Sequence, residues 1–297
     1  MTWLSDATVD HLRDIADWPD PPGDRYEFVE LLARGGMGTV YLARDRELDR
    51  DVAIKVLSPM VSASAEQSAV ERMRQEARTL ARLEHPGIVP VYDSGLLQDG
   101  RFYYVMKRVQ GPRLDQHVAE RPLAERLRLF TRICEPVAFA HAHGIVHRDL
   151  KPENVMVGPF GEVLVMDWGI GMVGTPGYMA PEQEDRGGVD ERSDVYALGG
   201  ILHFLMVGAP PDAAPLRGPR ALQAICRQAR AVNPSDRYPT VVALAADVDR
   251  YLAGEPVSAS PEGIVDRLLR FSRKHRAAIT LVVVYLVLRF VIAWLAP

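Results

Sequence analysis

The sequence predicts an α+β protein of two lobes, with a small β-rich N-lobe, a larger helical C-lobe and a transmembrane helix at the C-terminus. Three observations support this architecture. Residues 26–109 show mostly strand-like patterns, and the residues after Gly111 show mostly helical ones. Because the strands come first and the helices follow, they belong to separate layers rather than to alternating βαβ units. Residues 277–296 contain a single charged side chain, that of Arg289.

Composition narrows the functional class. A chain of 297 residues can bury a hydrophobic core, and 47% hydrophobic with 25% charged residues is typical of a globular protein. The net charge of −4 disfavours a nucleic-acid-binding protein, which usually carries a basic surface. Cys134 and Cys226 have no CxxC partner, so we expect no zinc site and a reducing, cytosolic compartment. The first residues predict no secretory signal peptide, because no basic stretch is followed by an apolar run.

We expect four segments along the chain. Residues 1–25 are an acidic N-terminal extension that ends in a proline-rich breaker. Residues 26–256 form the main domain, divided into an N-lobe at 26–109 and a C-lobe at 110–256. A basic linker at 257–276 leads into the transmembrane helix at 277–297.

Each lobe has its own periodic pattern. In the N-lobe, alternation predicts strands within 26–57 and over 101–109, and apolar residues at helical spacing predict a helix over 66–84. In the C-lobe, the same spacing predicts helices from Leu123 to near Gly144, over 193–207 and over 219–231. Two short strand patterns, 155–157 and 163–166, predict a hairpin between them.

The apolar C-terminal segment is long enough to cross the roughly 30 Å hydrocarbon layer of a bilayer as a helix. Basic residues precede it, and they predict that the main domain lies on the cytoplasmic side. These residues are Arg267, Arg270, Arg273, Lys274 and Arg276. A helix packed on the soluble domain is the alternative, which the lack of a polar face disfavours. We therefore expect a single-pass protein of the cell membrane with a cytoplasmic main domain.

A glycine cluster lies between the first two strand patterns. Gly35, Gly36 and Gly38 occur within residues 33–40. A dinucleotide-binding turn would be followed by a helix, and a Walker loop would end in Gly-Lys-Ser/Thr. The sequence has neither feature here, so both kinds of site are disfavoured. A glycine-rich hairpin can fold over phosphates because the missing side chains let backbone N–H groups approach closely. An ordinary tight turn is the alternative reading of the cluster alone.

Lys55 has the position expected of a phosphate-binding lysine. Strand alternation places it on the same face as the small Ala53, which leaves room for a flat base. Glu76 lies at the border of the apolar, inward-facing side of the following helix. It is therefore a candidate partner for the Lys55 ammonium. Solvated side chains are the alternative for both charged residues.

Polar side chains suited to phosphoryl transfer are concentrated between His147 and Asn154. Because the predicted hairpin follows, Asn154 and Asp167 lie at its two outer ends, where an amide oxygen and a carboxylate can share hard cations such as Mg²⁺. Asp149 can accept a substrate hydroxyl proton, and Lys151 can offset charge on the transferred group. Each of these polar residues alone would be interpreted as an ordinary surface residue. Their occurrence together at these spacings is very improbable by chance.

On these motifs the chain resembles the eukaryotic-like serine/threonine protein kinases of bacteria over roughly residues 26–256. In the first part of the chain, the matching segments are the glycine loop at 33–40, the VAIK lysine Lys55 and the helix glutamate Glu76. In the second part they are the catalytic loop HRDLKPEN at 147–154, Asp167-Trp168-Gly169 in place of DFG, and the stretch from Gly174 that ends in Ala180-Pro181-Glu182. The helix motif at 193–199 also matches, as does Arg237, whose family counterpart pairs with the glutamate that corresponds to Glu182. The resemblance implies the protein-kinase-like fold.

The resemblance also implies ATP as the nucleotide, Mg²⁺ or Mn²⁺ as the cation, and serine or threonine hydroxyls of proteins as acceptors. It gives catalytic roles to Asp149, Lys151 and Asn154, and cation binding to Asn154 and Asp167. It makes Met106 the gatekeeper before a hinge at 107–109. The nucleotide-binding residues it implies are Ala33, Gly35, Gly36, Gly38, Val40, Ala53, Lys55, Glu76 and Met106. Protein substrates, the membrane and further copies of the chain are the expected partners, and nucleic acid is not.

Three departures from the family pattern stand out. Ala33 replaces the first loop glycine, and Trp168 replaces a phenylalanine, which gives the apolar plug an indole N–H that needs a partner. Residues 170–174 contain no Ser, Thr or Tyr, so the loop phosphosite that Arg148 would help to hold is missing. The segment between Asp167 and Thr175 is also shorter than is usual in the family. It supports a pseudokinase or membrane scaffold as the alternative function. A small-molecule kinase of related fold is a third possibility. The retained catalytic groups favour an active kinase in membrane-anchored signalling.

Overall fold

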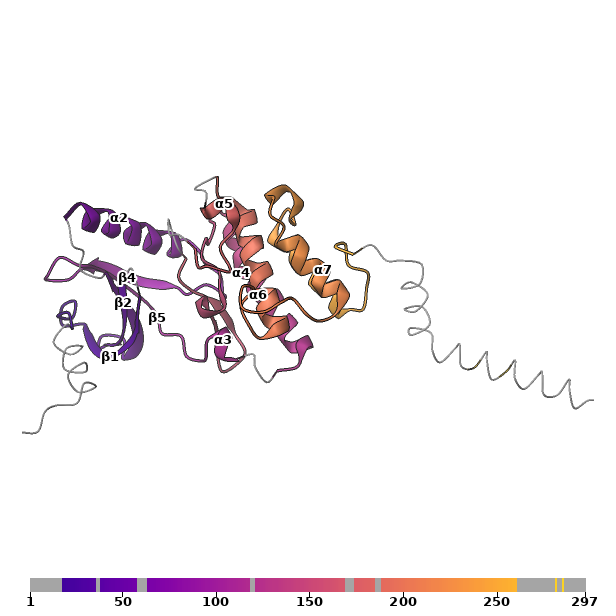
Figure 1. Ribbon diagram of the computed structural model, residues 1–297. Coiled ribbons are helices and arrows are strands. Elements are labelled where there is room, and N and C mark those ends of the chain that lie inside the picture. The colour runs from indigo at the N-terminus through magenta and orange to yellow at the C-terminus, as the bar shows by residue number, and fades with distance from the viewer. Residues whose placement is uncertain are drawn as a thin grey trace, which may run out of the picture.

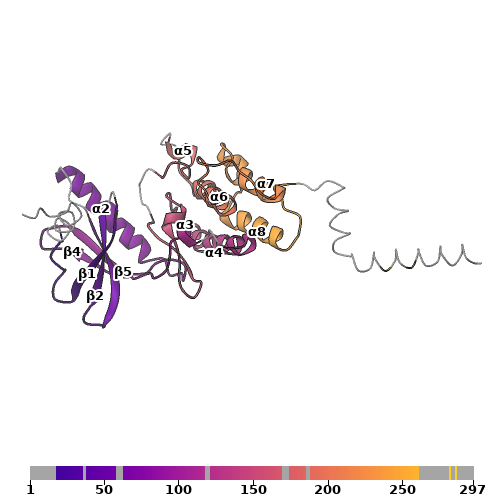
Figure 2. The ribbon, with the colours of Figure 1, turned by 60° about the horizontal axis from the view of Figure 1, so that its bottom comes forward.

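The computed structural model describes residues 18–35, 38–57, 63–117, 121–168, 174–184 and 188–260, together with Leu281 and Tyr285; the side chains of residues 63–69, 72 and 76 are not described. Within these residues the chain forms the two predicted lobes (Figure 1). A sheet with one helix beside it makes the N-lobe, and a group of helices makes most of the C-lobe. The view in Figure 2, turned by 60°, shows the same separation.

The N-lobe is a five-stranded antiparallel sheet in the order β1-β2-β3-β5-β4. Its elements are β1 (Tyr26–Arg34), β2 (Gly38–Asp45), β3 (Arg50–Leu57), α2 (Ala63–Leu80), β4 (Val91–Leu96) and β5 (Phe102–Lys107).

The predicted alternation along β3 is confirmed. Val52, Ile54 and Val56 are buried in one cluster, formed on the face of the sheet away from α2. Leu57 belongs to a different cluster, with Met73 of α2 and other residues. Because side chains two positions apart share a face, Lys55 projects on the α2 side of the sheet.

The C-lobe is built around three packed helices. Its elements are α3 (Leu114–His117), α4 (Leu123–Ala142), η1 (Pro152–Asn154), β6 (Val155–Val157), β7 (Val163–Val165), α5 (Pro181–Glu184), α6 (Glu191–Val207), α7 (Arg220–Ala229), η2 (Pro234–Asp236) and α8 (Val241–Leu252). Helices α4, α6 and α8 contact one another around fully buried side chains such as Phe130, Leu198 and Leu244. Each side chain of this kind contributes roughly 1.5–3 kcal/mol by leaving water.

Helix α6 has local signals at both ends. The side chain of Asp190 accepts a hydrogen bond from the backbone N–H of Arg192, which caps the first turn. Gly208 ends the helix with a φ of 82°, a left-handed conformation that glycine adopts at little cost. The helix is therefore fixed in register, and it carries Ser193 and Asp194 at defined positions.

Some element boundaries and several elements differ from the sequence-based expectation. Helix α2 ends at Leu80 rather than at Glu84, and residues 83–85 have no regular structure before Pro86, whose ring disfavours helix in the residue that precedes it. The sequence predicts neither β4 nor α8. Strand β4 contains Asp93, Ser94 and Gly95, which disfavour strands, and its pairing with β5 overrides that preference. Helix α8 begins with two β-branched valines, which weakens the helical signal.

The predicted transmembrane segment lies outside the described residues, except for Leu281 and Tyr285. In the part of the chain that the structure describes, no helix combines the length and the apolar character needed to span a bilayer. Most of the N-terminal extension also lies outside the described part, but Trp18 packs edge-on against Tyr41 with ring centroids 5.7 Å apart. Cys134 and Cys226 are both buried free thiols.

Candidate active site

The small C-lobe hairpin positions the two predicted cation ligands. Strands β6 and β7 pair Val155 with Val165, and the next hydrogen bond runs from the backbone N–H of Met166 to the carbonyl of Asn154 at 2.8 Å. Asn154 and Asp167 therefore lie at the open end of the hairpin, as the sequence predicts. Asp167 has a φ of 53°, a strained conformation for a residue other than glycine.

A buried carboxylate on α6 holds the catalytic loop. Asp194 is fully buried and accepts hydrogen bonds from the backbone N–H groups of His147 and Arg148, at 2.8 and 2.9 Å. His141 on α4 bonds to the same carboxylate at 2.7 Å. Arg148 has a φ of 70°, and strain of this kind persists only where surrounding contacts fix it. Two bonds from successive N–H groups to one side chain provide that constraint.

His147 links the loop to the hairpin. Its Nδ1 accepts a hydrogen bond from the backbone N–H of Asp149 at 3.3 Å, so its Nε2 carries the proton and bonds to the carbonyl of Met166 at 2.9 Å. Burial lowers the pKa of His147, although Asp194 and other acidic groups oppose this effect. The ring lies 4.7 Å from that of Trp168, whose indole N–H donates to the carbonyl of Val165 at 3.2 Å. The tryptophan that replaces the family's phenylalanine thus has its partner.

Four polar side chains form a closed network at the predicted catalytic centre. Asp149 accepts hydrogen bonds on Oδ1 from the backbone N–H and the hydroxyl of Thr175, at 3.1 and 2.8 Å. Its Oδ2 accepts from Asn154 at 3.3 Å and lies 3.2 Å from Nζ of Lys151. Lys151 also donates to the Thr175 hydroxyl at 2.7 Å. The structure therefore brings together all three predicted catalytic residues.

The predicted phosphate-binding lysine reaches across from the N-lobe. Nζ of Lys55 lies 3.2 Å from Oδ1 of Asp167, and 5.7 Å from the centre of the Tyr104 ring. Lys55 is only 8% exposed. Its ammonium is the main reason that the pKa of Asp167 lies below the usual value. Glu76 lies in α2, but its side chain is outside the described part, so the predicted Lys55–Glu76 ion pair stays a prediction.

The glycine-rich hairpin has little space at one of its glycines. A Cβ added to Gly38 would lie 2.6 Å from the carbonyl oxygen of Val56, so β2 and β3 could not approach as they do with any other residue there. Ala33 pairs with Val40 next to the hairpin turn, and Ala33 is exposed. The backbone N–H of Gly35 donates to the carbonyl of Gly38 at 2.9 Å. The predicted residue Gly36 lies outside the described part.

Two further nucleotide-site residues are neighbours in the sheet. Ala53 of β3 pairs directly with Met106 of β5, at the point where the sheet continues into the connector between the lobes. A small residue opposite a flexible thioether leaves room for a flat apolar group beside the connector. Of the predicted nucleotide contacts, the structure thus places Ala53, Lys55 and Met106 on adjacent strands.

A buried ion pair fixes the segment after the catalytic centre. The guanidinium of Arg237 is 0% exposed and binds the carboxylate of Glu182 through two bonds of 2.6 and 2.7 Å, as the family resemblance implies. Its remaining N–H groups donate to backbone carbonyls of Ala231, Arg192 and Val232, so all five donors are used.

Sequence reasoning missed several residues of this arrangement. Asp194 and His141 orient the catalytic loop, and Gln183 joins it to the segment at 174–184 by donating to the carbonyl of Arg148 at 2.8 Å. Asp194 stands in the helix motif at 193–199 that the family resemblance identifies, but its contact with the catalytic loop could not be read from the sequence. No such signal identifies His141 or Gln183, since their partners lie 53 and 35 positions away in the chain.

Known proteins are similar to this chain in both sequence and fold. A family model described as a protein kinase domain matches residues 26–285. Serine/threonine-protein kinase PknB of Mycolicibacterium smegmatis is 37% identical over 290 residues, covering 84% of this chain and 46% of that protein. Serine/threonine-protein kinase PknD of Chlamydia trachomatis is 33% identical, covering 78% of this chain and 32% of that protein. The chain therefore spans less than half the length of these curated relatives. The crystal structure of the Mycobacterium tuberculosis PknI kinase domain aligns with a TM-score of 0.63 at 32% identity, covering 76% of this chain and 96% of that domain.

Proposed function

Because this chain belongs to the protein kinase family, we propose that it is an active kinase that transfers the γ-phosphoryl group of ATP to serine and threonine hydroxyls of proteins. The observation that carries this proposal is the environment of Asp149. Its carboxylate is held by Thr175, Asn154 and Lys151 within hydrogen-bond distance, next to the open end of the hairpin that bears Asp167.

Each of these residues has a defined task in the proposed reaction. Asp149 accepts the proton of the attacking hydroxyl as the new oxygen–phosphorus bond forms. Lys151 lies beside it and stabilises the negative charge of the transferred group. Lys55 holds the non-transferred phosphates, and its contact with Asp167 ties the N-lobe to the hairpin. The reaction needs little covalent chemistry from the protein, so positioning and charge carry most of the rate enhancement.

The residues at the open end of the hairpin suit a hard divalent cation such as Mg²⁺. The amide N–H₂ group of Asn154 donates to the backbone carbonyl and the carboxylate of Asp149, at 2.8 and 3.3 Å, which leaves the amide oxygen as a ligand. The Asp167 side chain is 50% exposed, so its carboxylate can accept a second partner besides Lys55. Mg²⁺ characteristically uses one or two such protein oxygens together with nucleotide phosphates and water. When bound, the cation offsets the charge of the phosphates.

A phosphorylation assay tests the proposed activity. The full chain, incubated with radiolabelled ATP, Mg²⁺ and a generic basic protein, should place phosphate on serine and threonine. The Asp149→Asn variant should lose a factor of about 100 or more, because it cannot accept the proton. Nucleotide binding without transfer by the unmodified chain would identify a pseudokinase instead. Transfer to small molecules but not to proteins would identify a small-molecule kinase.

We also propose that the C-terminal segment tethers the kinase domain to the cytoplasmic face of the cell membrane. The support is the apolar stretch at 277–296 with its basic flank. Leu281 and Tyr285 are both helical, and they are 71% and 59% exposed, so neither is packed on the domain. In such an arrangement, copies of the kinase can meet by lateral association in the membrane.

A further inference from the structure

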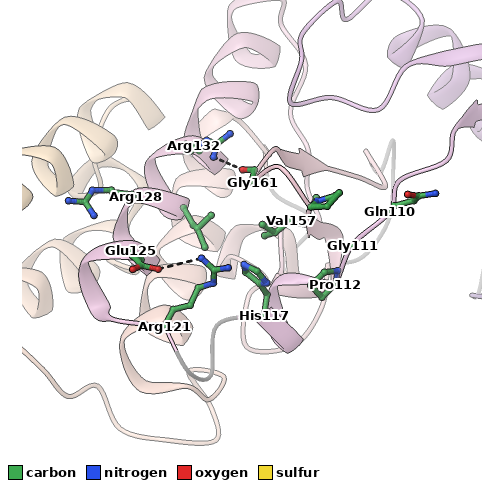
Figure 3. Close-up of a pocket in the computed structure, with 13 residues that line it drawn as sticks. Gln110, Gly111, Pro112, His117, Arg121, Glu125, Arg128, Arg132, Val157 and Gly161 are labelled. Carbon is green, nitrogen blue, oxygen red and sulfur yellow. Dashed lines mark hydrogen bonds and ion pairs between the residues drawn. The ribbon is translucent and has the colours of Figure 1, made fainter.

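A pocket lies on the C-lobe, outside the proposed catalytic centre. Figure 3 shows it between the connector that follows β5, helix α3, the face of α4 and the turn of the β6–β7 hairpin. Its volume is about 470 Å³, within the range of ligand-binding cavities. Leu129 and Val157, both buried, form apolar parts of its wall. None of the residues implied in nucleotide or cation binding lines it.

The charged residues around this pocket are mostly basic. Arg121, Arg128 and Arg132 contribute positive charge, and among the described residues that line the pocket Glu125 is the single acidic one. Glu125 lies 3.4 Å from Arg121 and offsets its charge. Arg132 donates a hydrogen bond to the carbonyl of Gly161. Within the described part of the chain, neither Arg128 nor Arg132 forms an ion pair with an acidic side chain. Two guanidinium charges thus remain uncompensated along α4.

These charges form a stripe rather than a point. Residues 125, 128 and 132 recur at helical spacing on one face of α4, and Arg121 precedes the helix. Arg132 lies eleven positions after Arg121, which corresponds to about 16 Å along a helix axis. Figure 3 shows Arg121 turned toward His117, whereas Arg128 and Arg132 extend in other directions. A single small anion cannot reach all three, but an extended peptide of about five residues spans the same length.

An unpaired buried nitrogen and an exposed aromatic side chain lie in or beside the pocket. Nε2 of His117 is buried without a hydrogen-bond partner among the described residues, and the ring lines the pocket. Phe160, in the hairpin turn between the lining residues Pro159 and Gly161, is 96% exposed. An aromatic side chain at that exposure beside a concave, partly apolar surface is typical of a protein-binding site.

We propose that this surface, the α4 pocket, binds an extended acidic segment of a partner protein. An apolar residue of the segment enters the pocket against Leu129 and Val157, and flanking carboxylates pair with Arg128 and Arg132. The concave shape favours a peptide over a lipid bilayer, because a flat membrane surface would not reach His117. The proposal rests on charge and shape alone and does not require phosphoryl transfer.

Fluorescence anisotropy with defined peptides tests this proposal. The full chain in a nonionic detergent is titrated with a dye-labelled peptide of about twelve residues, rich in Glu and Asp, with two central leucines and no Ser, Thr or Tyr. A non-hydrolysable ATP analogue and Mg²⁺ are present to fill the nucleotide cleft. Reference peptides replace either the acidic residues by Gln and Asn or the leucines by Gly. We expect the first peptide to bind and both reference peptides to bind at least about tenfold more weakly.

Charge reversal locates the binding site. Arg128→Glu with Arg132→Glu should weaken peptide binding about tenfold or more, because two attractive charges become repulsive. The matched control is Arg217→Glu with Arg227→Glu, which changes the net charge equally at two exposed positions outside the pocket. Circular dichroism checks the fold, and Arg128→Glu alone replaces the double variant if that variant is unfolded.

Three outcomes would overturn the proposal. The first is the absence of peptide binding, and the second is equal weakening by the control pair. The third outcome concerns lipid and is measured by hydrogen exchange on the protein in nanodiscs. If residues 157–161 are protected only when phosphatidylserine is present, and Arg128→Glu removes this protection, the surface binds the membrane. Together with an absence of peptide binding, this result would assign the surface to the membrane.

Discussion

The hydroxyl of Thr175 donates a 2.8 Å hydrogen bond to Oδ1 of Asp149 and accepts one of 2.7 Å from Nζ of Lys151. A phosphoryl group on this oxygen would remove the donated proton and add a charge of about −1.5 to −2 beside the carboxylate. It would also compete with Asp149 for the ammonium of Lys151. We therefore expect phosphorylation of Thr175 to inhibit transfer, and activity to be independent of loop phosphorylation.

Phosphatase treatment followed by initial-rate measurement tests this expectation. Because residues 170–174 offer no hydroxyl, the treated and untreated proteins should have rates within about a factor of two. Nucleotide, substrate or association in the membrane would then set the activity. A large loss of rate that returns on autophosphorylation, with phosphate mapped to Thr175, would contradict the prediction.

Replacing Lys55 by methionine should remove most phosphoryl transfer while leaving the fold intact. Methionine fills a similar space on the α2 side of β3 but cannot bind phosphate or Asp167. We expect a loss of about 100-fold or more in rate, typical of removing a charge that stabilises the transition state. Circular dichroism and a steady-state assay check both parts of the statement, and full activity in a folded variant would refute the role of Lys55.

The buried Arg237–Glu182 pair should be important for stability. Arg237→Met leaves the Glu182 carboxylate without its main partner and removes the guanidinium bonds to three backbone carbonyls, which typically costs about 3–5 kcal/mol. Arg121→Met removes a pair that is 41% and 48% exposed, and its cost should be about 0.5 kcal/mol. Urea unfolding compares the two variants. Similar losses from both would show that burial does not strengthen the Arg237 contact.

The neutral state of His147 predicts a pH dependence of stability. Burial lowers the pKa of His147 below its ordinary value of 6.5, so the unfolded chain takes up a proton at a pH where the folded chain does not. Stability contributed by this group is therefore present above pH 6.5 and is lost as the pH falls below it. Between pH 7 and 5, the free energy of unfolding should fall less for His147→Gln than for the unmodified protein. The difference between the two slopes should be at most about 1.4 kcal/mol per pH unit. Parallel curves for the two proteins would count against the assignment.

Deletion of the residues after Ser272 should release the protein from membranes. The deletion removes the whole apolar segment together with three of the basic residues that precede it. Fractionation of cells by ultracentrifugation, followed by immunoblotting, measures the distribution of both forms. Recovery of the full chain in the soluble fraction without detergent would show that the segment does not anchor the kinase.

The residues of the catalytic loop and the hairpin could be predicted from the sequence because their chemistry is local. Asp149, Lys151 and Asn154 lie within six consecutive positions, and the hairpin that brings Asp167 to Asn154 closes within a few residues. The alternation along β3 was equally readable, since neighbouring side chains on a strand point to opposite faces. Local spacing, together with the family resemblance, therefore indicated the proposed phosphoryl transfer and most of the residues that we propose carry it.

Only the tertiary structure decided which distant residues hold that chemistry in place. Asp194 fixes the backbone of His147 and Arg148 from more than 40 positions away, and no periodic pattern encodes such a contact. The edge strand β4 likewise forms against its own residue preferences, because pairing with β5 supplies hydrogen bonds that the segment alone lacks. The basic stripe on α4 is visible in the sequence, but the pocket beside it exists only where α3 and the β6–β7 turn meet that helix. A sequence specifies spacing along the chain, whereas burial and partners across it depend on how the elements pack.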